Sequence, residues 1–142
     1  MTIAYYWPIA LGVAANIVYH LCAKYVPASM NPFASLTATY LVATVCSAGL
    51  YLVTNKGVGL LREVGKMNWA SVVLGLAVMC MEFGYIMAFR VGWEVSKASA
   101  TQTVIGIAVL LVAGAVLFRE PITLKKALGV LLCLAGLFLI NN

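Results

Sequence analysis

One short segment of the chain carries polar groups at helical spacing inside an apolar run. The stretch GVAANIVYHLCAK places Gly12, Asn16, His20 and Lys24 four residues apart. Residues four apart advance by roughly 40° around a helix, so these four share one side with a slow drift. An amide, an imidazole and an amine are costly to bury unless something pairs with them or uses them. The spacing predicts a polar stripe that lines a cavity between helices.

A second candidate is the carboxylate of Glu82, within the stretch MCMEFGY. It is the only acidic residue well inside an apolar run, since the other three lie in connections. A charge near the bilayer centre costs roughly 2.5–3.5 kcal/mol on insertion scales, so a carboxylate there is typical of a site that exchanges a proton or a cation. The alternative is a structural ion pair with Lys24, Arg90 or Lys97.

A third set of polar residues lies at the start of the next apolar run, in the stretch SKASATQT. Gln102 and Thr103 lie on one side of the helix expected there, together with Ser99. The alternative for Gln102 and Asn16 is a hydrogen bond between helices, and for His20 it is packing. The residues that we predict to bind a substrate or to exchange a proton or a cation are Asn16, His20, Glu82, Gln102 and Thr103.

The elements that must position these residues are membrane-spanning helices. The 142 residues are 64% hydrophobic and 9% charged, whereas soluble domains carry about 25% charged residues. Mean hydropathy is +1.04. Each apolar run is near or above the roughly 17–25 residues that a helix needs to cross a bilayer. The runs cover residues 3–26, 33–53, 69–89, 98–118 and 124–140. We predict an all-α membrane protein with five transmembrane helices, in a single domain over residues 1–142.

The sequence argues against several other classes of function. It has one histidine and no Ser/His/Asp set, metal-ligand spacing or Gly-rich phosphate loop, so we expect neither an enzyme nor a bound metal or cofactor. The four cysteines lie at irregular spacing inside apolar runs, which favours a packing role. No basic stripe with interleaved aromatic residues predicts a nucleic-acid partner. The expected partners are the lipid bilayer and a small-molecule substrate.

Capping and charge predict the ends and the orientation of the helices. Thr123 is the expected N-cap of the last helix. With five spans the chain ends lie on opposite sides, and short basic loops stay in the cytoplasm. The N-terminal side holds Lys56, Arg62, Lys66, Arg119, Lys125 and Lys126, whereas the other side holds Lys24, Arg90 and Lys97. We predict a cytoplasmic N-terminus in a cell membrane, most simply a bacterial inner membrane.

The last segment, LFREPITLKKALGVLLCLAGLFLINN, carries a family resemblance. It resembles the end of a repeat in the drug/metabolite transporter superfamily, in which Thr-Leu follows an acidic turn and two glycines mark the closing helix, here Gly129 and Gly136. The five runs together look like one EamA-like repeat over essentially the whole chain. The resemblance implies a secondary transporter for a small metabolite or organic cation, with proton coupling as one form of energy input.

The chain also resembles the small multidrug resistance family, in which a glutamate eight residues before a lysine binds a proton or a cationic drug. Eight residues before Lys24 stands Asn16, whose amide does not titrate. Most EamA-like transporters carry two repeats, and because five is odd, two repeats in series are inverted. We therefore expect a dimer, either an inverted homodimer or a heterodimer with a homologous repeat. The alternative function is a non-transporting subunit that pairs with a homologous chain or a membrane enzyme.

Overall fold

The computed structural model describes residues 2–55 and 59–142, and within them every regular element is a helix. Five helices are long and apolar enough to span a membrane, as predicted. The helices are α1 (Thr2–Lys24), α2 (Pro32–Thr54), α3 (Leu60–Val64), α4 (Trp69–Arg90), α5 (Val95–Leu117) and α6 (Leu124–Asn141). The short α3, of five residues, lies in the connection between the second and third spans and is too short to cross a membrane. Lys56, which entered the charge count, lies outside the described residues.

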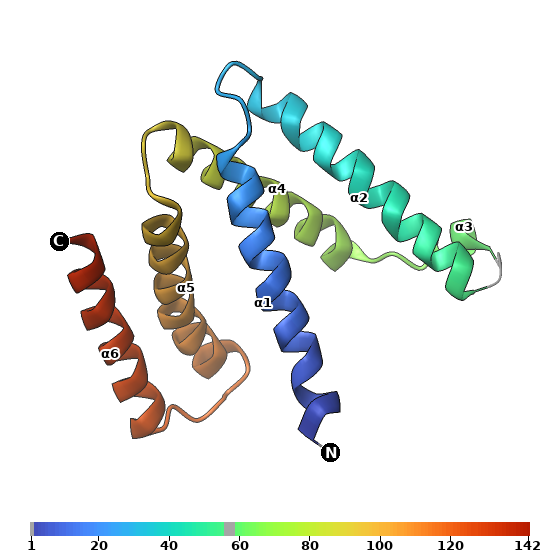
Figure 1. Ribbon diagram of the computed structural model, residues 1–142. Coiled ribbons are helices and arrows are strands. Elements are labelled where there is room, and N and C mark those ends of the chain that lie inside the picture. Colours follow the sequence, from blue (N-terminus) through green and yellow to red (C-terminus); the bar gives the residue numbers. More distant parts are fainter. Residues whose placement is uncertain (1, 56–58) are drawn as a thin grey trace. The chain divides into compact units, whose positions relative to one another are not determined.

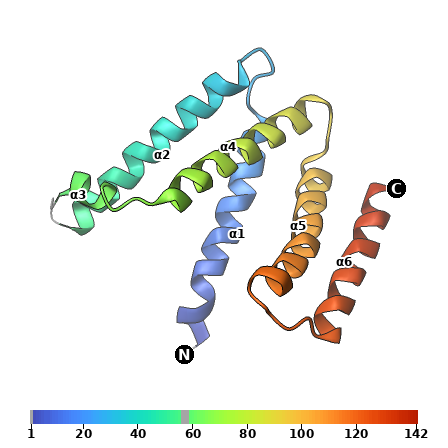
Figure 2. The same ribbon diagram turned by 180° about the vertical axis from the view of Figure 1, so that it is seen from behind.

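The chain divides into two compact units, and α1 belongs partly to each. One unit comprises residues 22–90 and the other comprises residues 1–21 with 91–142. In the first unit α2 packs against α4, and α3 contacts α2 (Figures 1 and 2). In the second unit α5 and α6 form an antiparallel hairpin (Figure 1). The single-domain organisation stays a prediction.

Side chains at the helix starts set where the helices begin. The predicted N-cap is confirmed, because the Thr123 hydroxyl accepts a hydrogen bond of 3.3 Å from the backbone N–H of Lys126. At α2, the Asn31 side chain accepts from the N–H of Phe33 at 2.9 Å, and Pro32 occupies the first helical position. Helix α5 begins at Val95 rather than at residue 98, because its polar first turn continues the helix beyond the apolar run.

Few of the described side chains are buried. The buried apolar residues are Ala23, Leu36, Tyr85, Ile86, Phe89, Ala98 and Leu137. Large apolar side chains are exposed along all five spanning helices. In a bilayer such side chains face lipid or other helices, so exposure of this kind is expected of a spanning protein.

Candidate functional site

Glu82 lies on α4 within the unit formed by residues 22–90, and its side chain is half-buried. Thirteen residues of α4 precede it and eight follow it, which places it inside the spanning segment. Among the described residues the ion pairs are Lys66 with Glu63 and Lys97 with Glu94, both on the surface, so Glu82 takes part in neither. Among the residues that the structure describes, the carboxylate is therefore in the membrane without an ion-pair partner.

The cations proposed as structural partners of Glu82 within this unit contact other groups. The Arg90 guanidinium donates hydrogen bonds to the backbone carbonyls of Pro27 and Met30, in the connection between α1 and α2. The Lys24 ammonium lies 5.5 Å from the centre of the Phe89 ring, a cation–π arrangement. Both positive groups thus make these contacts at the end of the α2–α4 pair, and the ion pairs described for the chain do not join either of them to Glu82.

The group that does meet Glu82 is the Tyr40 hydroxyl from α2. It approaches the carboxylate closely enough to interact electrostatically. The hydroxyl oxygen is shielded and makes no hydrogen bond of normal geometry with any described residue. In a hydrogen bond between the two groups, the tyrosine O–H donates to the charged carboxylate. Tyr40 and Glu82 are thus a donor and an acceptor that are held together by the packing of α2 on α4.

A groove of about 670 Å³ runs between the same two helices. Four of the residues that line the groove carry side-chain hydroxyls, and the other four are apolar residues or glycine. It is lined by Tyr40, Ala43, Thr44, Ser47, Ser71, Leu74, Gly75 and Val78. Tyr40 lines the groove and also approaches the Glu82 carboxylate. Val78, which lines the groove on α4, lies one helical turn before Glu82. The groove therefore ends within about one helical turn of Glu82.

The other predicted site residues belong to the second unit, and the structure distributes them over its helices. His20 is buried, with 4% of its surface exposed, and its ring meets the Tyr19 ring edge-on at 5.1 Å. Asn16 on α1 and both Gln102 and Thr103 on α5 are exposed. Because His20 and Glu82 lie in different units, their meeting across a cavity stays a prediction.

A comparison of the sequence with known protein families agrees with the five spanning helices. The family model of the EamA-like transporter family matches residues 4–142. The chain belongs to this family. It is therefore a membrane transporter of the drug/metabolite superfamily, as the resemblance of the last segment implied. Neither curated proteins nor solved structures gave a significant match.

Within this EamA-like chain, sequence reasoning missed the hydroxyl residues that accompany Glu82. Tyr40, Thr44 and Ser47 follow the i, i+4, i+7 spacing of one helix face. On α4, the small residues Ser71 and Gly75 precede Glu82 on the matching face. This spacing is a signal that could have found the face, but hydroxyls are common in spanning helices and their pairing depends on which helices pack together.

Proposed function

We propose that this EamA-like transporter moves a small metabolite or organic cation, with Glu82 as the group that binds a proton or the substrate cation. The observation that carries the proposal is a half-buried carboxylate inside a spanning helix, without an ion-pair partner among the described residues and beside a tyrosine hydroxyl. An unpaired carboxylate is expensive at this depth and is rare there without a functional role.

The proposed chemistry is a competition at one carboxylate. When charged, Glu82 binds a cation, and the Tyr40 hydroxyl is placed to donate a hydrogen bond to the remaining lone pairs. When protonated, Glu82 is neutral and releases the cation. The exchange of the two ligands couples their movements, because the carboxylate cannot hold both at once.

Exposed polar groups in the second unit support an assembly of two repeats. Asn16, Gln102 and Thr103 lie in apolar spanning helices and are exposed on the single chain. Amides facing lipid are costly, so a second copy or a homologous repeat in the opposite orientation would cover them and complete the cavity. In this proposal His20 is the polar counterpart of Glu82.

The test uses dicyclohexylcarbodiimide, an apolar reagent that reacts with protonated carboxyl groups. We expect it to label Glu82 in membranes, more slowly as the pH rises, and we expect tetraphenylphosphonium to protect Glu82 as a cationic probe. Glu82→Gln should abolish labelling and lower probe transport by roughly tenfold or more, because a hydrogen bond to a charged group contributes about 1.5–3 kcal/mol. Glu63→Gln, which removes an exposed surface ion pair, is the matched control.

If Glu82→Gln transports the probe normally between about pH 5.5 and 8.5, a range that spans histidine and a perturbed carboxylate, then Glu82 is structural. The coupling group would then be sought at His20.

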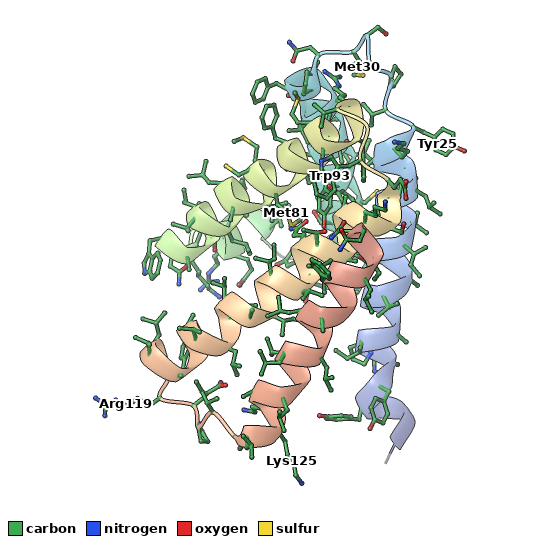
Figure 3. The ribbon with its side chains drawn as sticks, turned by 90° about the vertical axis from the view of Figure 1, so that its left-hand side faces the viewer. Tyr25, Met30, Met81, Trp93, Arg119 and Lys125 are labelled. Carbon is green, nitrogen blue, oxygen red and sulfur yellow. The ribbon has the colours of Figure 1, made fainter. Side chains whose placement is uncertain are left out.

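The orientation is proposed on the basic residues of the connections. Arg119 and Lys125 both extend from the end of the α5–α6 hairpin where the two helices are joined (Figure 3). We place this end and the N-terminus in the cytoplasm of a bacterial cell. Cysteines introduced as Thr2→Cys and Asn142→Cys should react with an impermeant thiol reagent from opposite sides of the membrane. Reaction of both from the same side would contradict the five-span topology.

A further inference from the structure

The groove between α2 and α4 has one end near a membrane surface and one end near Glu82. Ser71 lies two residues after α4 begins, and Ser47 lies seven residues before α2 ends. The C-terminal end of α2 and the N-terminal end of α4 both adjoin the connection that contains α3. Tyr40 lines the inner end of the groove and approaches Glu82. The groove thus leads from the α3 side of the membrane to the buried carboxylate.

Two of the hydroxyls along the groove are arranged as acceptors. The Thr44 hydroxyl donates its proton to the backbone carbonyl of Tyr40 at 2.7 Å, and the Ser47 hydroxyl donates to the carbonyl of Thr44 at 3.0 Å. With these protons committed, the oxygen lone pairs remain to accept hydrogen bonds from a ligand. Gly75 leaves room opposite, since a Cβ built there would have no neighbour within 4 Å. Water and hydronium, which are small donors, fit such a lining.

Beyond Glu82, the helix pair is closed by packed side chains. Leu36 and Ile86 are buried in the same unit, with 3% and 5% of their surfaces exposed. Arg90 holds the α1–α2 connection at this end through its hydrogen bonds to backbone carbonyls.

We propose that the groove is a water-filled half-channel that connects Glu82 with the α3 side of the membrane, and that the buried Leu36 and Ile86 side chains close the other side. A hydronium ion in the groove transfers a proton to a carboxylate oxygen of Glu82, which leaves a neutral carboxyl group and a water molecule. The role of this proton in transport rests on the proposed function, whereas the half-channel itself is tested without any transport measurement.

The first test is thiol labelling in sealed vesicles with a charged, impermeant methanethiosulfonate reagent. Single cysteines replace Thr44, Ser47 or Ser71 in a background whose four native cysteines are alanine and whose Glu82 still reacts with carbodiimide. Val45→Cys and Val73→Cys place the thiol on the opposite faces of the same two helices, where both valines are more than half exposed. Lys66→Cys, in the exposed connection after α3, marks the α3 side.

The groove thiols should react from the side that labels Lys66→Cys, in whichever orientation a chain inserts. Their rates should exceed those of the two valine positions by roughly tenfold or more, because thiolates are disfavoured in hydrocarbon. Reaction from the opposite side, from both sides equally, or at the rate of the valine controls would overturn the half-channel.

The second test fills the groove. Gly75→Leu projects a side chain into it without a clash, and Gly84→Leu places the same side chain on the opposite face of α4, where a Cβ also has open space. In the Thr44→Cys and Ser47→Cys backgrounds, Gly75→Leu should slow labelling severalfold and Gly84→Leu should leave it unchanged. Equal effects of the two leucines would contradict the assignment of the path. If the groove thiols label as expected while Glu82→Gln transports normally, the half-channel stands and the proposed coupling role fails.

Discussion

Within the α2–α4 pair, Tyr40 is the side chain that distinguishes Glu82 from a carboxylate in plain hydrocarbon. A hydroxyl stabilises the charged form of a carboxylate without neutralising it, whereas a lysine or arginine would form an ion pair. Exchange of protons or cations requires a carboxylate that is stabilised but still available to a ligand. The approach of Tyr40, and the engagement of Arg90 and Lys24 elsewhere, meets that requirement.

We expect Tyr40→Phe to increase the rate at which carbodiimide labels Glu82 severalfold at a given pH. The ring and its packing remain, but the charged carboxylate loses its donor, so a larger fraction of Glu82 is protonated. The rate is measured in native membranes by mass spectrometry. Tyr25→Phe, at an exposed position in the connection after α1 (Figure 3), is the control. Labelling at the rate of the unaltered protein would show that the hydroxyl does not engage Glu82.

The connection between α1 and α2 is held by the helix ends that flank it. Asn31 caps α2 by accepting from the N–H of Phe33, while Arg90 at the end of α4 donates to the carbonyls of Pro27 and Met30. These carbonyls belong to a non-helical segment, so the guanidinium satisfies acceptors that helix formation leaves open. Arg90 therefore links α4 to the start of α2 and positions the faces that carry Tyr40 and Glu82.

Arg90→Gln should release this connection and lower the free energy of unfolding by about 1–3 kcal/mol, the usual cost of leaving polar groups unsatisfied. Trypsin should then cleave after Lys24 faster than in the unaltered protein. Arg90→Lys should restore only part of the stability. The lysine keeps the positive charge, but its ammonium lacks the planar fork of a guanidinium. Thermal unfolding in detergent and limited proteolysis measure both effects, with Arg62→Gln on the exposed α3 as control. Unchanged cleavage in Arg90→Gln would remove the positioning role.

Glycines on the last spanning helix are the residues that we predict to hold two repeats together. Gly129 and Gly136 on α6 are seven residues apart, and a Cβ at either would have no neighbour within 4 Å. Small residues on one helix face allow the close approach of another spanning helix. This face is the one that we predict to hold two repeats together.

Gly129→Leu should weaken the dimer and leave the chain folded, because the added side chain meets open space within its own chain. Crosslinking in native membranes should show dimer for the unaltered protein and a severalfold loss of dimer for the variant. Gly49→Leu, which also has open space but lies on α2, should retain the dimer. Only monomer in the unaltered protein at all concentrations would contradict the assembly.

Local features of the sequence were enough to predict the spans, the fold class and the family. The hydropathy of about twenty consecutive residues decides whether a helix crosses a bilayer, and the Thr123 cap acts on a residue three positions away. Glu82 could likewise be identified from the sequence, because an acidic residue stands out in an apolar run.

The surroundings of Glu82 were decided by tertiary structure. Its neighbour Tyr40 is 42 residues distant in the sequence, and only the packing of α2 on α4 selects it. The same packing directs Arg90 to carbonyls of the α1–α2 connection, whereas charge alone had made an ion pair with Glu82 plausible. The physical reason is that the hydropathy of one helix determines that it enters the membrane, whereas side-chain shape and hydrogen bonding between helices determine which faces meet.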